Sequence, residues 1–256
     1  MARALGVWVF FLLVFLGLRF LELPGLGSAA APVAAAIATA ATLFFIARLL
    51  KTEGGEFRDV GLNVSRRFLP HFVLGTALGI ALAAVMIGAM LLLTPLEISP
   101  AAGANLGAVL VTSFVVLTLL ALLEEVTFRS YPLFRLSQAW GIRGAIYVTS
   151  IVFAFYHGLM IENLIGPGVW GLYFGLMAVM TRSIALPTGF HVGLNWVLAI
   201  VGDKPQYTGS LWELSINEGT GYIGAETLGL AMQIVLLIIG VLMIEWFLAR
   251  ERRGGT

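Results

Sequence analysis

The sequence predicts an all-α membrane protein, a bundle of about eight transmembrane helices. Of its 256 residues 59% are hydrophobic and only 11% are charged, whereas a soluble domain has roughly 25% charged residues. The apolar residues also come in continuous runs near the length of about 20 residues that crosses a bilayer as a helix. They lack the alternation typical of a membrane β-barrel. An ordinary water-soluble globule is therefore excluded.

The eight apolar segments are expected to form a single integral-membrane domain over residues 1–256. We place them at about 4–21, 29–49, 70–94, 106–131, 144–161, 167–181, 185–201 and 227–248. Pro132 follows the fourth segment and should end or kink that helix, because proline cannot donate a backbone hydrogen bond. No internal repeat of the kind found in many transporters is visible.

The basic residues predict the orientation of the helices. With the N-terminus in the cytoplasm, all but three of the 15 Lys and Arg fall in cytoplasmic segments. The three are Lys204, in a loop on the other side, and Arg19 and Arg129, within spans. Lys and Arg are enriched in short cytoplasmic loops, so we expect both termini in the cytoplasm, and the protein in the plasma membrane.

Composition also limits partners and chemistry. A net charge of +1 argues against a nucleic-acid partner, because such proteins carry a basic excess. The absence of cysteine excludes a thiolate nucleophile, a zinc–thiolate site and a disulfide scaffold. Membrane lipid is therefore the expected environment, with no nucleic acid bound.

Three ionisable residues lie together near the end of the fourth expected span. Glu124, Glu125 and Arg129 follow an otherwise apolar run, and a charge at the centre of a membrane helix costs roughly 2.5–3.5 kcal/mol. Glu125 and Arg129 are four residues apart with the glutamate first, so we expect them to pair on one helix face. Glu124 lies about 100° around the helix from Glu125, which leaves its carboxylate available for chemistry.

Two further spans carry polar residues at a similar depth. The fifth contains Phe153 and His157, and the seventh contains His191 and Asn195, each pair on one helix face. At about 1.5 Å per residue, Glu124 lies about 10–16 Å from the cytoplasmic end of its span. His157 lies about 21 Å in, and His191 and Asn195 about 14 and 20 Å in. We expect these groups to meet, although each alone could simply be a hydrogen bond between helices.

These residue types together can hydrolyse an amide bond. A carboxylate and an imidazole can activate water, and a second imidazole and an amide NH₂ can donate hydrogen bonds to an oxyanion. No Gly-x-Ser-x-Gly or His-Glu-x-x-His motif occurs, which disfavours a serine nucleophile and the common zinc-protease arrangement. We expect no cofactor, but Glu124, His157 and His191 remain an alternative ligand set for a divalent metal such as zinc.

Three motifs, each on its own apolar segment, occur in a fixed order. They are Glu124-Glu125-x-x-x-Arg129, Phe153-x-x-x-His157 and His191-x-x-x-Asn195. This order resembles the CPBP family of CaaX proteases and bacteriocin-processing enzymes, which includes the type II CaaX prenyl endopeptidases. The resemblance covers about residues 106–201, which are the expected catalytic core.

The resemblance implies a role for each motif residue. Glu124 with His157 would activate the attacking water, and His191 with Asn195 would form the oxyanion hole. Three supporting residues would orient and pack the site, namely Glu125, Arg129 and Phe153. The family fold is an eight-helix membrane bundle whose cavity opens towards the cytoplasm and the lipid. A metal-free glutamate mechanism is implied, although the family was first regarded as one of metalloproteases.

We therefore expect an intramembrane endopeptidase with an active site accessible from the cytoplasmic side. Its substrate would be a membrane-associated or lipidated peptide or protein. The alternatives are a non-catalytic membrane scaffold or immunity protein, and a proton-coupled transporter, which the missing inverted repeats disfavour.

Glycine pairs four residues apart arise often in a sequence with 30 glycines, and they favour close helix packing within the chain over a dimer face. They are Gly75-x-x-x-Gly79, Gly103-x-x-x-Gly107 and Gly171-x-x-x-Gly175.

Overall fold

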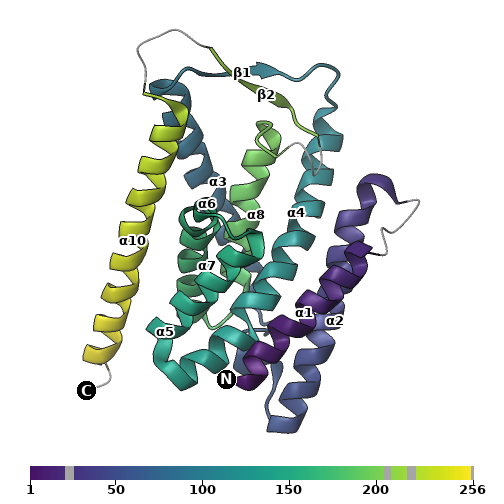
Figure 1. The fold of residues 1–256 in the computed structure, drawn as a ribbon, viewed down its shortest axis with the longest axis vertical. Helices are drawn as coiled ribbons and strands as arrows, with labels where there is room; N and C mark the ends of the chain where they lie inside the picture. The colour runs from purple at the N-terminus through teal and green to yellow at the C-terminus, as the bar shows by residue number, and fades with distance from the viewer. Residues whose placement is uncertain (21–25, 205–208, 218–222, 255–256) are drawn as a thin grey trace.

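A computed structural model describes residues 1–20, 26–204, 209–217 and 223–254, and shows an all-α helix bundle with one pair of strands (Figure 1). The predicted fold class is confirmed. The α-helices are α1 (Ala2–Phe20), α2 (Ala30–Glu53), α3 (Phe68–Leu93), α4 (Leu106–Arg129), α5 (Tyr131–His157), α6 (Ile161–Ile165), α7 (Pro167–Thr181), α8 (Ala185–Ile200) and α10 (Ala225–Gly254). Two 3₁₀ turns, η1 (Gly27–Ala29) and η2 (Phe57–Val60), and the antiparallel strands β1 (Leu96–Pro100) and β2 (Trp212–Ile216) complete the described chain.

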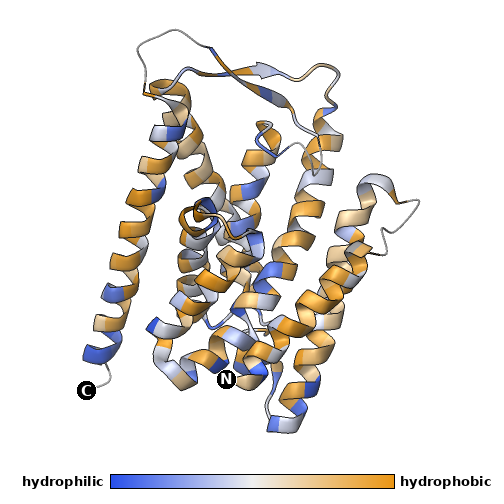
Figure 2. Ribbon diagram, viewed as in Figure 1, coloured by the Kyte–Doolittle hydropathy of each residue, from blue (hydrophilic) through white to orange (hydrophobic). Residues whose placement is uncertain are grey.

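Length and apolar composition allow five helical segments to cross a membrane. They are Gly27–Glu53, Phe68–Leu93, Leu106–His157, Ile161–Thr181 and Ala225–Arg253, with Ala2–Leu18 and Ala185–Ile200 as shorter apolar helices. Every expected span coincides with a helix, but the count of eight crossings and the cytoplasmic termini stay predictions. Figure 2 shows apolar residues along most of each long helix and hydrophilic residues near the lower ends of α2 and α10.

Two of the expected spans form a shorter hairpin. α4 ends at Arg129, and Pro132 lies in the first turn of α5, as predicted for a proline beyond a helix end. α5 then kinks at Gly141, where φ is +77°. Beyond the kink it runs only to His157, and α6 connects it near mid-height to the 15-residue α7 (Figure 1). The end of α5 is thereby placed inside the bundle.

Helices α3 and α8 cross at very short distance through glycines on both sides. A Cβ added at Gly79 would lie 2.2 Å from the Phe190 carbonyl oxygen, and one at Gly189 would lie 2.0 Å from the Phe72 carbonyl oxygen. Small residues allow such backbone contact between membrane helices. Because residue 191 lies about 200° around α8 from Gly189, this contact directs His191 away from α3.

Of the two other expected glycine pairs, one packs against a neighbouring helix and the other does not. The pair Gly171 and Gly175 packs on α5, where added Cβ atoms would lie 2.9 Å from Ser150 and 3.2 Å from Ile146. The expectation for Gly103 and Gly107 is wrong. Gly103 lies in a turn with φ +68°, and neither glycine approaches another helix within 4 Å.

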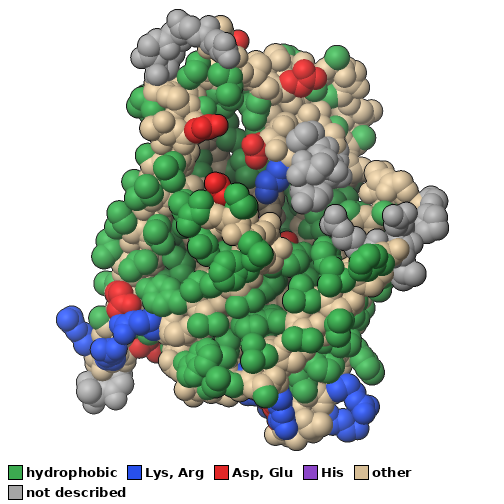
Figure 3. All heavy atoms as spheres, in the orientation of Figure 1, with side chains coloured by type: hydrophobic (Ala, Val, Ile, Leu, Met, Phe, Trp, Pro, Cys, Tyr) green, Lys and Arg blue, Asp and Glu red, His purple; other side chains and the backbone are tan. Residues whose placement is uncertain are grey.

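An ion-pair cluster joins helix ends near the N-terminus. Glu53 at the end of α2 contacts Arg3 at 2.7 Å and Arg135 at 2.6 Å, and it accepts a hydrogen bond from Tyr131. Basic side chains gather at this lower end of the molecule (Figure 3). The expected intramembrane Arg19 belongs to α1, but its side chain lies outside the described part of the chain.

Candidate active site

Helix α4 carries the buried ion pair that its sequence spacing predicts. Nε of Arg129 lies 3.7 Å from Oε2 of Glu125, and both side chains are completely buried. Glu124 lies around the helix, with 14% of its side chain exposed, and lines a cavity. One glutamate is therefore used to neutralise a buried arginine, while the other faces open space.

Aromatic rings complete the surroundings of Arg129. Its guanidinium carbon lies 4.0 Å from the centre of the Phe153 ring and 5.2 Å from that of Phe174. Cation–π contacts of this kind favour a desolvated arginine by about 2 kcal/mol. Phe153 thus lies beside the site, as expected, and its ring covers the guanidinium.

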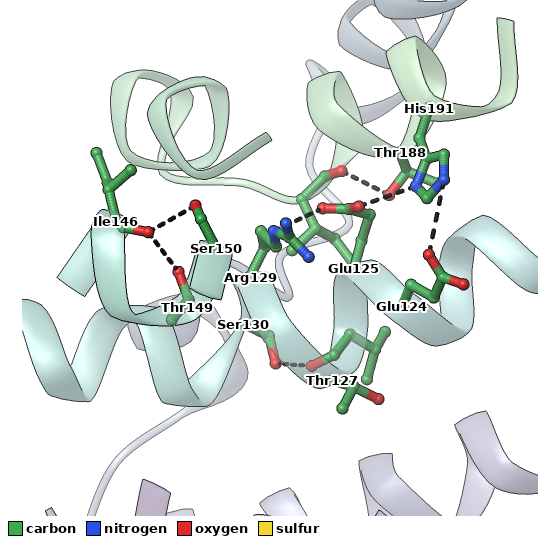
Figure 4. Close-up of polar contacts among 12 residues, drawn as sticks. Glu124, Glu125, Thr127, Arg129, Ser130, Ile146, Thr149, Ser150, Thr188 and His191 are labelled. Carbon is green, nitrogen blue, oxygen red and sulfur yellow. Dashed lines mark hydrogen bonds and ion pairs between the residues drawn. The ribbon is translucent and has the colours of Figure 1, made fainter. Parts of the chain in front are cut away.

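The two predicted imidazoles approach Glu124 from different helices. Nε2 of His157, at the end of α5, lies 3.9 Å from Oε1 of Glu124, and Nε2 of His191, on α8, lies 3.6 Å from Oε2. Figure 4 shows the carboxylates of Glu124 and Glu125 on either side of the His191 ring. The distances to Glu124 exceed those of direct hydrogen bonds and suit bridging by water.

The partners of the other ring nitrogens assign the tautomers. Nδ1 of His157 lies 2.9 Å from the Phe153 carbonyl oxygen, and Nδ1 of His191 lies 3.1 Å from Oε1 of Glu125. A carbonyl and an ionised carboxylate only accept hydrogen bonds, so each Nδ1 must carry the proton. Both Nε2 atoms are consequently directed towards Glu124.

This geometry gives Glu125 a second contact, with His191, which suits the orienting role that the family resemblance implies for it. Its Oε2 faces Arg129 and its Oε1 faces His191. A carboxylate that holds the far nitrogen of a functional histidine fixes both the tautomer and the ring orientation. The spacing of four residues predicted the contact with Arg129, but no local spacing could predict a contact with a residue 66 positions away.

Asn195 lies one turn beyond His191 and lines the same cavity. Its Oδ1 accepts a hydrogen bond of 2.8 Å from Nζ of Lys204, which also lines the cavity. Lys204 was expected in a loop on the side away from the cytoplasm, with no predicted function. The structure therefore brings all four expected catalytic side chains to one cavity and adds a cation.

The cavity has a volume of about 510 Å³ and mostly apolar walls. Its floor is the set of polar groups around Glu124, and its walls include Phe15 and Leu18 of α1 and Ala31 of α2. These wall residues lie towards the end of the bundle that is remote from the N-terminus. The N-terminus and the access to the site were both expected on the cytoplasmic side. Because these wall residues lie away from the N-terminus, the lining does not favour both expectations together.

Glu124, His157 and His191 are the three residues expected as alternative ligands of a metal. In residues 1–20, 26–204, 209–217 and 223–254, however, no group of three or more His, Cys, Asp or Glu side chains is arranged to hold a metal ion. The zinc alternative stays a prediction.

Residues 106–197 match the family described as Rce1-like, type II CAAX prenyl endopeptidase. The resemblance to the CPBP and CaaX proteases is thus confirmed for this part of the chain, and it supports a peptidase. The match runs from the start of α4 into α8, so the Rce1-like region contains Glu124, His157, His191 and Asn195. No match was found among curated proteins.

The Rce1-like region leaves out several parts of the cavity. Lys204 lies beyond it, and so do the walls that α1 and α2 contribute. The walls thus combine residues of the Rce1-like region, such as Leu120 and Trp170, with residues of α1 and α2.

Proposed function

We propose that the protein is an intramembrane endopeptidase that hydrolyses a peptide bond with a water activated by Glu124 and His157. One observation supports this most strongly. The Glu124 carboxylate lies between the Nε2 atoms of two histidines from different helices, at the floor of a cavity with apolar walls. Hydrogen bonds that only hold helices together would not require titratable groups from three helices to converge on one point.

The proposed reaction uses each group once. Water lies between Glu124 and His157 and donates one hydrogen bond to Nε2 of His157, which orients it. Its oxygen attacks the carbonyl carbon of the substrate while Glu124 takes the other proton. The carbonyl π electrons move to the oxygen, which becomes an oxyanion. The side-chain NH₂ of Asn195 donates a hydrogen bond to that oxyanion, and such donors are worth about 2.7–4 kcal/mol.

His191 is the second proposed donor to the oxyanion. Its Nδ1 proton is directed at Glu125, so donation from Nε2 requires the ring to carry protons on both nitrogens. Collapse of the tetrahedral intermediate then breaks the C–N bond, and the proton held by Glu124 passes to the leaving nitrogen. The products are a carboxylic acid and an amine, and the transfer of the proton to the amine restores the carboxylate of Glu124.

The walls favour a substrate that reaches the site through the membrane. Apolar side chains line most of the cavity, which would bind a lipid chain or an apolar peptide segment. Glu124 is five residues from the end of α4, or about 8 Å along the helix axis. We accordingly place the scissile bond in the half of the membrane nearer the basic helix ends, which we propose to be the cytoplasmic half.

The test uses purified full-length protein in lipid vesicles and an internally quenched peptide ending in a prenylated cysteine plus three residues. Wild type is expected to cleave it, with products identified by mass spectrometry. His157→Gln should lose the activity, while His71→Gln, which changes a histidine outside the cavity lining, should keep it. A folded wild type that cleaves neither this peptide nor its unprenylated form contradicts the proposal.

A further inference from the structure

Lys204 is returned to the active-site cavity by a sharp turn after α8. The amide N–H groups of Gly202 and Asp203 donate hydrogen bonds to the carbonyl groups of Ala199 and Leu198, at 3.1 and 3.0 Å. These bonds reverse the chain over the last turn of the helix. The ammonium of Lys204 consequently reaches a residue nine positions earlier.

Gly202 is what permits this turn beside strand β2. Its φ of +92° disfavours residues with a Cβ, and a Cβ there would lie 2.5 Å from the carbonyl oxygen of Trp212. The Leu211 amide N–H also donates to the Ile200 carbonyl at 2.9 Å. The position of Lys204 is thus set by backbone contacts on both sides of the turn.

The contact between Lys204 and Asn195 fixes the side-chain amide of Asn195. An ammonium group only donates hydrogen bonds, so the atom of Asn195 that faces it at 2.8 Å must be the oxygen, Oδ1. The NH₂ group then points away from the lysine. Without this partner, the two ends of the amide could exchange places by rotation about its last side-chain bond.

We propose that Lys204 is a positioning residue that holds the Asn195 amide with its NH₂ available to the oxyanion. The inference rests on the proposed function, in which Asn195 is an oxyanion donor. It adds a residue from outside the region matched to the protease family. Preorganised donors are effective because they need no reorientation during the reaction, and a charged partner holds an amide more strongly than a neutral one.

Two other roles for Lys204 make different predictions. A lysine that bound a substrate carboxylate directly would act mainly on KM. A lysine that only stabilised the fold would act on the melting temperature. A positioning role acts on kcat and depends on Asn195.

The experiment compares Lys204→Met, Lys204→Arg and Lys51→Met in purified full-length protein, with the prenylated quenched peptide as probe. Lys51 is the other lysine of the chain and lies exposed on α2. Lys204→Met should lower kcat by about tenfold or more, up to the roughly 10²–10³-fold loss of a missing oxyanion donor, with KM and melting temperature changed little. Lys204→Arg should recover part of kcat, and Lys51→Met should match wild type.

A double-mutant cycle with Asn195→Ala decides the mechanism. Lys204→Met should have almost no further effect on kcat in the Asn195→Ala background, because the group it positions is gone. An equal loss in both backgrounds, a loss confined to KM, or wild-type kcat in Lys204→Met would each overturn the inference. Wild-type kcat in Lys204→Met together with an inactive Glu124→Gln would leave the proposed function intact. An active Glu124→Gln would overturn the proposed function itself.

Discussion

Oε1 of Glu125 lies 3.1 Å from Nδ1 of His191, while the other oxygen of the same carboxylate faces the buried guanidinium of Arg129. One side chain thus links the buried ion pair within α4 to the ring that points at Glu124. Removal of this carboxylate should therefore affect both stability and chemistry.

Replacing Glu125 should destabilise the protein through Arg129. Glu125→Leu leaves a fully buried guanidinium without its ion-pair partner, a change that typically costs about 3–5 kcal/mol. We expect low yield and a lower melting temperature in detergent. The double variant Glu125→Leu/Arg129→Leu removes both charges and should regain much of the stability, but it should remain inactive because His191 has lost its partner. A single variant as stable as wild type contradicts this reading.

The glycine crossing of α3 and α8 should tolerate no side chain. Gly189→Ala places a methyl group 2.0 Å from a backbone oxygen of α3, and separating the helices should cost at least about 1–3 kcal/mol and move His191. Gly88→Ala is the matched control, because a Cβ there meets nothing within 4 Å. Melting temperatures and kcat should fall only in the first variant. Equal behaviour of the two would show that the close crossing is not important.

Activity should fall at alkaline pH through Lys204. Burial lowers the pKa of the Lys204 ammonium, against the opposing effects of Asp203 and Glu124. The cationic form is the one that holds Asn195, so activity is present below this pKa and is lost as pH rises through it. The loss should come below the pH of about 10.4 at which an ordinary lysine titrates.

Lys204→Arg provides the control for this pH profile, because arginine stays charged throughout the accessible range. Its alkaline loss should move to higher pH or disappear. The imidazoles of His157 and His191 share the cavity, and the carboxylate of Asp203 belongs to the same turn, but all three are present in both proteins. If the pH profiles of wild type and Lys204→Arg coincided at alkaline pH, Lys204 would not be the titrating group.

The orientation in the membrane can be measured directly because the sequence has no cysteine. Lys51→Cys at the basic end and Ser99→Cys in β1 each introduce one exposed thiol at opposite ends of the bundle. A membrane-impermeant maleimide should label Ser99→Cys in intact cells and Lys51→Cys only after permeabilisation. This result would mean that the cavity walls formed by α1 and α2 lie towards the side away from the cytoplasm. The reverse labelling would instead favour cytoplasmic access and contradict the charge-based topology.

Local spacing predicted much of the site, because helical geometry is regular. The four-residue spacing between Glu125 and Arg129 correctly identified Glu125, not Glu124, as the partner of the arginine. The same spacing placed His191 and Asn195 on one helix face. The depth estimate also brought residues of three helices to a common level. These arguments work within one helix, or between helices of known direction, and they need no knowledge of which helices are neighbours.

The parts that sequence reasoning missed depend on contacts between distant segments. Lys204 was counted as a loop residue, since nothing local shows that Gly202 and β2 turn the chain back over α8. Gly189 and Gly193 have the same spacing as Gly75 and Gly79 but were not singled out. Spacing alone cannot say which glycine pair meets another helix, as the failed expectation for Gly103 illustrates.

The most direct test of the central claim is the turnover number of Glu124→Gln in folded protein. Glutamine keeps the size of the side chain but cannot take a proton from water, so kcat on the prenylated quenched peptide should fall by about 10²–10⁴-fold, with the melting temperature retained. Glu97→Gln, on the exposed strand β1, should leave kcat unchanged. Wild-type kcat in a folded Glu124→Gln protein would contradict the account.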